Sequence, residues 1–391
     1  MTDFAINPSI CMSNLCYSIF KLDPYIACSH SCVYCYSRKF IWNWKVKTRT
    51  EYVKKFKKLL RELSVDGYPP PIPFRLSALT DPFQEIERSE RLSLQLLTLC
   101  LKYNVPVIVS TKSPLVIEEP WIDVILELHD KKLVIVQYTL IVLEEDKSRI
   151  LEPKAPSPDK RLSAIEKLSS EGIPVIIRFQ PIIPYVNSDE EYMEKIVSTV
   201  KAAGAKQIIA ECYRYLTNKD LEPFSKILSQ YYFRPLTNKQ LWETYPESPY
   251  KHPKIGVRYE IFQQLLKITK KYSIDFSTCR EGFYNLHTAK NCCGMHYFSK
   301  YYLRPTLYEI WKEINQEENL EKTIRKLSTK ITNFTEKINN KSIRNNLLKH
   351  HQIIINTIKN ANTLRKICPV LMQINNKITK LPSKLTNFTL R

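Results

Sequence analysis

The sequence predicts an α/β protein, a partial (β/α)6 barrel of the TIM type with a C-terminal helical extension. Three junctions with one shared pattern support this fold class. In "KYNVPVIVS", "SEGIPVIIRF" and "AAGAKQIIAE" a helical pattern ends at Asn104, Gly172 or Gly204, and a β-branched run follows. Gly or Asn at that point is typical of a left-handed helix C-cap. The repeated order of helix, cap and apolar strand indicates parallel β/α units.

Six apolar runs are the expected strands. They lie near residues 18–22, 74–79, 105–110, 133–140, 175–179 and 207–211. Helices are expected between them near residues 50–64, 88–103, 120–129, 158–170 and 189–203. A further helix near 258–273 leads to "SIDFSTC", which could be a seventh strand. The strands are rich in Val and Ile, so both faces of the sheet should be covered, in an open barrel or in a doubly wound sheet.

We expect two domains. The barrel would occupy residues 1–285, with the aromatic- and proline-rich residues 213–256 as an insertion that could act as a lid. Residues 286–391 would hold a Cys/His segment and a basic helical tail.

The tail begins with apolar residues spaced alternately four and three apart, which predicts an amphipathic helix: Leu320, Ile324, Leu327, Ile331, Phe334 and Ile338. After Asn339 and Asn340, a second helix is expected near 342–366.

Composition limits the class of protein. The 391 residues are 43% hydrophobic and 25% charged, which is typical of a globular chain. No apolar run approaches the length of a membrane span, and the N-terminus lacks the pattern of a signal peptide, so we expect a cytoplasmic protein with no membrane partner. The net charge is +20, and +11 of it lies in residues 311–391. Such a charge suits a nucleic-acid partner, although compositional drift explains it equally well.

Three of the eleven cysteines form a tight cluster in "CSHSCVYCYSR". Cys28, Cys32 and Cys35 have the spacing C-x3-C-x2-C. A structural zinc ion normally takes four ligands, usually as two separated pairs. Three thiolates on one loop suit an iron–sulfur cluster whose fourth iron stays open. His30 could be a fourth ligand, which keeps a zinc site as the alternative.

With Tyr34 as the aromatic residue before its last cysteine, this motif resembles the signature of the radical S-adenosylmethionine (radical SAM) superfamily. "LDPYIACSHSCVYCYSR" resembles the spore photoproduct lyase-like group within it. Segments that agree are "ALTDPFQEIE", "VIVSTKSPL", "LEPKAPSPDKRLSAIEKLSSEGIPV" and "RFQPIIP", so the resemblance covers residues 14–212. It implies a [4Fe–4S] cluster and S-adenosylmethionine (SAM), which together yield a 5′-deoxyadenosyl radical, and an electron donor such as ferredoxin or flavodoxin.

The resemblance also implies roles for residues at matching positions. Tyr34 would lie along the adenine of SAM, and Lys112 would pair with its carboxylate. Thr139 stands where the family tends to place a serine that contacts SAM. Arg178, at the next strand end, could contact SAM or substrate. The cluster ligands would be Cys28, Cys32 and Cys35.

The chain departs from spore photoproduct lyase at one position that matters. That enzyme ends its second strand with a cysteine that supplies a hydrogen atom, and this chain has Ala78 there. Tyr34 and Tyr36, at the positions implicated in radical relay, are both present. Because alanine cannot donate a hydrogen atom to a radical, we do not expect this chain to repair the thymine spore lesion.

A second group of candidate residues lies in "CREGFYNLHTAKNCCGMHYF". It contains Cys279, His287, Cys292, Cys293 and His296. These residues could form a second metal site, or one of the three cysteines could replace the missing hydrogen donor. The plain alternative is a strand-end thiol followed by a turn without chemistry.

Two functions from different classes therefore follow. The first is a radical SAM enzyme that acts on an unknown substrate, with nucleic acid as a candidate. The alternative is a non-catalytic, zinc-containing nucleic-acid-binding protein that uses Cys28, Cys32, Cys35 and His30 as its metal site. A scaffold with an idle cluster is a third possibility. Metal content separates the first two, because one predicts iron with sulfide and the other predicts zinc.

Overall fold

The computed structural model describes residues 3–41, 44–224, 236–245, 248–315, 320–368 and 370–371. The chain divides into two compact units. The barrel unit comprises Phe20–Thr278 and Leu286–Tyr302, and the helical unit comprises Met1–Ile19, Cys279–Asn285 and Leu303–Arg391. The division differs from the expected boundary at residue 285, because residues 1–19 belong with the C-terminal helices and residues 286–302 belong with the barrel.

A seven-stranded sheet forms the centre of the barrel unit, in the order β1-β4-β5-β6-β7-β8-β11. Every neighbouring pair in it is parallel. Each strand pairs with the next along the chain, so the order never reverses as it would in a doubly wound sheet. The predicted partial barrel is confirmed, and "SIDFSTC" supplies the seventh strand. The strands are β1 Lys21–Leu22, β4 Phe74–Leu76, β5 Val107–Thr111, β6 Val134–Thr139, β7 Val175–Ile182, β8 Gln207–Cys212 and β11 Asp275–Thr278.

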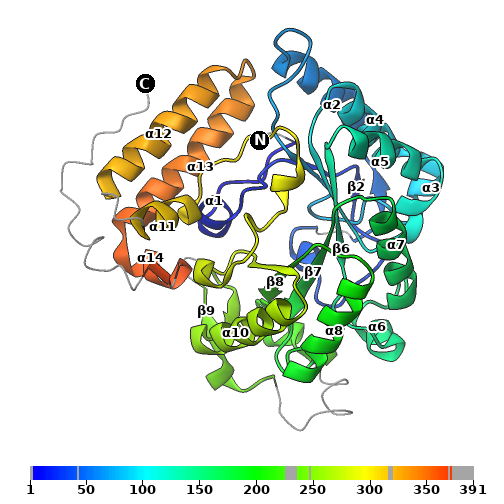
Figure 1. Cartoon of the computed structure of the whole chain (residues 1–391), viewed down its shortest axis with the longest axis vertical. Helices are drawn as coiled ribbons and strands as arrows, with labels where there is room; N and C mark the ends of the chain where they lie inside the picture. Colours follow the sequence, from blue (N-terminus) through cyan, green and yellow to red (C-terminus); the bar gives the residue numbers. More distant parts are fainter. Residues whose placement is uncertain are drawn as a thin grey trace. The chain divides into compact units, whose positions relative to one another are not determined.

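Six longer helices connect these strands: α2 Thr50–Leu63, α4 Leu92–Lys102, α5 Trp121–Asp130, α7 Pro158–Ser170, α8 Glu190–Ala202 and α10 Ile255–Lys271. Figure 1 shows α5, α7, α8 and α10 along the outer side of β6, β7 and β8. Helix α8 illustrates why they form. The Asp189 carboxylate accepts a hydrogen bond from the Tyr192 amide at 2.8 Å and so caps the first turn. Met193, Ile196 and Val200 then bury one face.

The three predicted helix caps have the expected left-handed backbone conformation. Asn104, Gly172 and Gly204 have φ of 53°, 79° and 89°. Each lies directly before a strand that carries polar residues at its carboxyl end. The caps therefore fix where the chain turns from the outer helices into the sheet.

Shorter elements complete the barrel unit: the hairpins β2 Tyr25–Ile26 with β3 Lys47–Thr48 and β9 Trp242–Thr244 with β10 Lys251–Pro253, and the helices α3 Glu87–Glu90 and α6 Glu145–Leu151. The second hairpin lies in the aromatic insertion predicted for 213–256. Residues 225–235 and 246–247 of that insertion lie outside the described residues. In the part of the chain that the structure describes, no helix is long and apolar enough to cross a membrane.

The helical unit contains α1 Ile10–Leu15, α11 Leu307–Asn315, α12 Leu320–Glu336, α13 Lys341–Lys359 and α14 Ala361–Ile367. The predicted amphipathic helix is α12, which buries Leu320, Ile324, Leu327 and Ile331, and it runs beside α13 (Figure 1). The second predicted helix is divided in two. The Asn340 side chain caps α13 and the Asn360 side chain caps α14, because each accepts a hydrogen bond from an amide three residues on.

The N-terminal segment of the helical unit packs against α13 through buried polar groups. His350 bonds with the Ser13 hydroxyl at 2.9 Å and with the Ile6 carbonyl at 3.0 Å. Asn14 donates to the Thr357 hydroxyl at 2.8 Å. Arg304 donates to the carbonyls of Ser13 and Cys16. Residues 6–16 and helix α13 therefore share one core.

Stability of the helical unit should fall below pH 6.5, because burial lowers the pKa of His350 to about 3. An unfolded histidine titrates near pH 6.5, so between these values the unfolded chain binds more protons. The free energy of unfolding then decreases as the pH falls, by up to about 1.4 kcal/mol per pH unit. His351 should have an effect of the same sign on stability, since burial lowers its pKa to about 4. Urea titrations from pH 4 to 8 measure the free energy of unfolding, which should depend less steeply on pH in His350→Asn than in wild type. Equal slopes for the two proteins would contradict this prediction.

Candidate active site

The cysteine loop follows the short strand β2. Cys28 and Cys32 are buried, and Cys35 is half-buried at the start of a short 3-10 helix, Tyr36–Lys39. Ala27 and Ser31 have φ of 61° and 55°. Two residues in this uncommon conformation wind the chain tightly, so that three thiols fit within eight positions.

Backbone contacts hold the loop on both sides of Cys28. The Gln84 side chain accepts from the Ser29 amide at 2.9 Å and donates to the Ala27 carbonyl at 3.2 Å. The Trp44 indole donates to the Cys28 carbonyl at 3.1 Å. Farther along, the Val33 amide donates to the Leu151 carbonyl at 2.9 Å. These four hydrogen bonds therefore hold the loop through its backbone.

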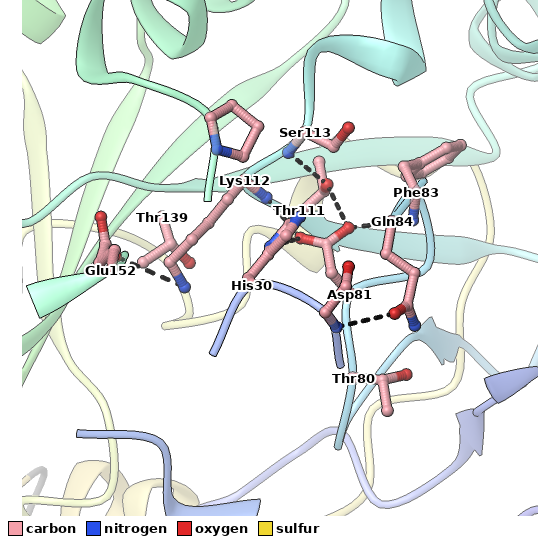
Figure 2. A network of polar contacts seen from close by, with 12 residues as sticks. His30, Thr80, Asp81, Phe83, Gln84, Thr111, Lys112, Ser113, Thr139 and Glu152 are labelled. Carbon is pink, nitrogen blue, oxygen red and sulfur yellow. Dashed lines mark hydrogen bonds and ion pairs between the residues drawn. The ribbon is translucent and has the colours of Figure 1, made fainter. Parts of the chain in front are cut away.

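A buried carboxylate, Asp81, connects the loop to the ends of two strands (Figure 2). One of its oxygens accepts from the Thr111 hydroxyl at 2.8 Å, and the other accepts from the Lys112 amide at 2.7 Å. His30 Nδ1 lies 3.5 Å from the same carboxylate. Burial lowers the pKa of His30 despite this negative neighbour. His30 is thus engaged with Asp81, and Asp81 fixes the backbone from which Lys112 extends.

Lys112, directly after β5, extends toward Glu152 and Tyr34. Its ammonium lies 3.8 Å from Glu152 Oε1 and 5.7 Å from the centre of the Tyr34 ring. The Tyr34 hydroxyl donates to the same carboxylate. Arg161 Nη1 lies 2.5 Å from Glu152 Oε2, and both side chains are fully buried. Glu152 therefore joins the cysteine loop, the end of β5 and helix α7.

Burial and neighbouring charges have opposing effects on the pKa values of Glu152 and Lys112. Burial favours the neutral acid, but Arg161 and Lys112 hold the pKa of Glu152 below its usual range. Burial also opposes the charge on Lys112, whose pKa is nevertheless raised by Cys32 and Glu152. Thr139, the last residue of β6, is buried nearby in the sheet, and its carbonyl accepts from Arg161 at 3.4 Å. The carboxyl ends of β5 and β6 thus carry a charged lysine and a hydroxyl.

The thiols fit an iron–sulfur cluster by their chemistry. Burial raises the pKa of Cys28 to about 12 and that of Cys32 to about 11, while Lys112 favours the Cys32 thiolate. Three soft ligands on one loop, beside cationic groups, are suited to a cluster that carries negative charge. A single metal ion would need its ligand atoms gathered around one point. Among the described residues, no three His, Cys, Asp or Glu side chains are gathered in that way. The three cysteines of a [4Fe–4S] cluster each bind a different iron atom, so their sulfurs need not converge on one point.

Ala78, at the end of β4, lies beside the loop. Its carbonyl accepts a hydrogen bond from the Tyr36 hydroxyl. Its amide donates to Asp23 Oδ1 at 2.8 Å. The Tyr36 side chain is 46% exposed. This strand end is thus fixed by its backbone, and its methyl side chain offers no donor.

Two cysteines lie inside the barrel, on a segment that we call the barrel floor, residues 291–294. Gln207 Nε2 donates to the carbonyls of Asn291 and Cys292, both at 3.1 Å. Gln137 Nε2 donates to the Cys293 carbonyl at 2.9 Å. Arg178 lies in β7 rather than at its end, and its guanidinium donates to Gln137 Oε1 at 2.9 Å. The floor is therefore held by side chains from β6 and β8.

Gly294→Ala should destabilise the barrel unit by about 2–4 kcal/mol. Gly294 has φ of 74°, and a Cβ there would lie 1.9 Å from Ile176 Cδ1. Gly67→Ala is the matched control, because Gly67 has φ of 87° and open space around it, and it should cost about 1 kcal/mol. Adding Ile176→Val, which removes Cδ1, should recover part of the Gly294→Ala loss. Urea unfolding measures all three variants, and equal losses at the two glycines would contradict close packing on the floor.

The remaining candidates of this segment have other partners. His287 Nε2 contacts the amide of Thr278 at 3.0 Å and its hydroxyl at 2.8 Å, at the end of β11. His296 Nδ1 lies 3.4 Å from the Asn291 side chain. Cys279 belongs to the helical unit. Within the described ranges no group of three ligand-type side chains that could hold an ion is found. The second metal site expected near Cys279, Cys292 and Cys293 stays a prediction.

Sequence reasoning missed four residues that hold this site: Asp81, Gln84, Glu152 and Arg161. All four lie in segments that carry the family resemblance, "ALTDPFQEIE" and "LEPKAPSPDKR". Both segments hold several charged or polar residues, and nothing in their order marks which of them become buried and paired.

Comparisons with known proteins agree with this geometry. A protein-family model for the "Radical SAM superfamily" matches residues 23–197. "Uncharacterized protein ORF301" of Acidianus two-tailed virus is 30% identical over 139 residues, which cover 35% of this chain and 44% of that protein. "Uncharacterized protein Rv2578c" of Mycobacterium tuberculosis (strain ATCC 25618 / H37Rv) is 23% identical over 196 residues, 48% of this chain and 56% of that protein. The chain thus spans about half the length of the curated relatives it matches.

A solved structure shares the fold. A spore photoproduct lyase mutant with bound AdoMet and dinucleoside spore photoproduct aligns with a TM-score of 0.50. The alignment covers 67% of this chain and 76% of that chain at 13% sequence identity. The likeness concerns the partial barrel, and the chemistry has to be argued from the residues at its mouth.

Proposed function

Residues 23–197 of this chain belong to the radical SAM superfamily, and on that premise we propose that the protein cleaves SAM reductively with a [4Fe–4S] cluster held by Cys28, Cys32 and Cys35. When bound, the cluster and SAM would supply the 5′-deoxyadenosyl radical. The observation that carries the proposal is the connection of Lys112, Glu152 and Tyr34 beside the cysteine loop.

The chain's own residues would bind and orient the cofactors. Lys112 would hold the SAM carboxylate as a point charge, because the Asp81 contact fixes its backbone and Glu152 keeps it charged. Tyr34, anchored through its hydroxyl to Glu152, would present its ring to the adenine. Thr139 offers a hydroxyl at the next strand end. Arg178, paired in register with Thr139, would reach SAM or substrate from β7.

The substrate is proposed to differ from the spore lesion. Ala78 stands at the strand end that would need a hydrogen donor, and its carbonyl accepts a hydrogen bond from the Tyr36 hydroxyl. The donor would then come from Cys279, Cys292 or Cys293. Two observations support nucleic acid as the substrate class: the net charge of +20, and the dinucleoside spore photoproduct bound to the similar lyase.

The described residues of the insertion, 213–224, 236–245 and 248–256, would cover the mouth of the barrel. They include Asp220, which pairs with Lys39 of the cysteine-loop helix. The Lys39 ammonium also lies 5.4 Å from the centre of the Tyr250 ring. These contacts support a lid that closes over the cluster side of the site. A ferredoxin or flavodoxin would deliver the electron.

The zinc-binding alternative predicts a different geometry. It needs Cys28, Cys32, Cys35 and His30 around one ion, whereas His30 contacts Asp81, and no such group gathers in the described ranges. The radical SAM proposal accounts for the same residues without that convergence.

The test is anaerobic. The chain is reconstituted with iron and sulfide, reduced with photoreduced deazaflavin and given SAM, and 5′-deoxyadenosine is measured with iron, sulfide and zinc content. Deoxyadenosine together with about four irons per chain would support the proposal. Bound zinc with no deoxyadenosine would replace it with the binding protein, and iron without deoxyadenosine would leave the idle-cluster scaffold.

A further inference from the structure

The barrel floor places a pair of thiols one layer beneath the candidate SAM site. On β6, residues 135, 137 and 139 share one face, since side chains alternate along a strand. Gly294 lies against Ile135 and Ile176, and the Cys293 carbonyl bonds with Gln137. Thr139 follows two residues higher, which is about 7 Å along the strand. Cys293 therefore lies inside the barrel directly below the level of Thr139 and Arg178, which are paired in register.

The environment of Cys293 is positively charged. Arg75 Nη2 lies 3.6 Å from its sulfur, and Arg75 Nη1 donates to Ser110 and Gln137, both at 2.6 Å. Arg178 donates to the same oxygen of Gln137. Arg75 is only 8% exposed, and none of these partners is a carboxylate. A buried arginine needs a counter-charge, and the sulfur of Cys293 is the group here that can carry one.

The neighbouring thiol completes the pair. The sulfurs of Cys292 and Cys293 are 3.8 Å apart and within hydrogen-bonding distance. The hydrogen bond from Cys292, helped by Arg75 and Arg178, lowers the pKa of Cys293 although burial would raise it. Cys100, which is buried without such neighbours, instead has a raised pKa. The contacts of Cys293 with Cys292 and Arg75 therefore favour a thiolate at Cys293.

We propose that Cys292 and Cys293 form a redox-active dithiol that quenches a carbon radical at the barrel mouth and ends as an intramolecular disulfide. The proposal rests on the proposed function and narrows its three candidate donors to this pair. It assigns Arg75 as a positioning residue that stabilises the thiolate through its 3.6 Å contact.

The step balances in atoms and electrons. The carbon radical takes a hydrogen atom from the Cys292 thiol, and the resulting sulfur radical bonds to the Cys293 thiolate. The surplus electron would leave to a one-electron acceptor, for which an oxidised iron–sulfur centre held by the cysteine loop would be suited, and a disulfide would remain. The sulfurs must close from 3.8 Å to about 2.05 Å. A dithiol reductant, of the thioredoxin class or dithiothreitol in vitro, returns both thiols.

The first test needs no cleavage of SAM. The full chain is equilibrated in glutathione buffers of graded potential, alkylated and analysed by mass spectrometry. We expect a Cys292–Cys293 disulfide that forms and reopens reversibly, and we expect Arg75→Lys to shift its midpoint by changing the thiolate. If the two thiols stay separately alkylated throughout the series, the proposal is wrong whether or not the protein is a radical SAM enzyme.

The second test uses the deoxyadenosyl radical as the probe. SAM is cleaved by the reconstituted protein in D2O without dithiol, and deuterium in 5′-deoxyadenosine is measured. The deuterium content of 5′-deoxyadenosine should be at least threefold higher with wild type and Cys100→Ser than with Cys292→Ser or Cys293→Ser. The Cys292–Cys293 disulfide should accumulate only when SAM is present. Equal deuterium in all four, without disulfide, overturns the dithiol but leaves the proposed function intact. No deoxyadenosine in wild type overturns the proposed function instead.

Discussion

Cys32→Ala should abolish 5′-deoxyadenosine formation and reduce bound iron from about four per chain to a trace. Cys32 is buried in the middle of the cysteine loop, and Lys112 favours its thiolate. A cubane held at three corners loses its site when one corner is removed, because two thiolates cannot fix it against exchange. Iron and sulfide analysis with chromatography of the nucleoside products measures both effects.

Cys100→Ala is the matched control for that loss. Cys100 is equally buried, in α4, and burial raises its pKa without a charged partner. The variant removes a thiol from the core at a modest packing cost and should keep its iron and its deoxyadenosine. Substantial iron retention in Cys32→Ala, or equal losses in both variants, would contradict a cluster held by this loop.

Glu152→Gln should lower the free energy of unfolding by about 3–5 kcal/mol, because it leaves Arg161 buried without its carboxylate. Arg161 is fully buried and lies 2.5 Å from Glu152. A domain is stable by only about 5–15 kcal/mol, so this loss is a large share of the total. The variant should also loosen Tyr34 and Lys112, which both contact the same carboxylate. Urea unfolding followed by circular dichroism gives the change in stability.

Glu145→Gln makes the same chemical change on the surface. Glu145 pairs with Arg149 one helical turn away, and both side chains are well exposed. Such a pair contributes about 0.5 kcal/mol or less. The double variant Glu152→Leu with Arg161→Met removes both charges and should recover part of the lost stability. A cost for Glu152→Gln as small as that for Glu145→Gln would show that the buried pair does not hold this part of the fold.

The alternation of helices and strands could be predicted because each β/α unit is specified locally. The caps at Asn104, Gly172 and Gly204 mark the turns, and the apolar runs that follow are the parallel strands. The division of the chain into a barrel unit and a helical unit was harder to predict from the sequence. Nothing in the pattern of residues 1–19 shows that they pack with α13, since that contact depends on side chains more than 300 positions apart.

The candidate site was predictable where a motif fixes spacing and unpredictable where it depends on packing. The three cysteines and Lys112 follow from the loop and from the end of a strand. Glu152 could not be assigned, because its role arises from charges brought in by β5 and α7. Arg178 was expected at the end of a strand and lies within β7, because that strand continues to Ile182.

The core that residues 6–16 share with α13 has a consequence for synthesis on the ribosome. Ser13 and Asn14 emerge early, and their partners His350 and Thr357 are made more than 330 residues later. At about 5–20 residues per second, the first segment waits roughly 17–70 s for its partners. The strands of the barrel pair in the order in which they are made, so they can assemble during that interval. A nascent chain stalled before α13 would carry a complete sheet and an N-terminal segment without its partners His350 and Thr357.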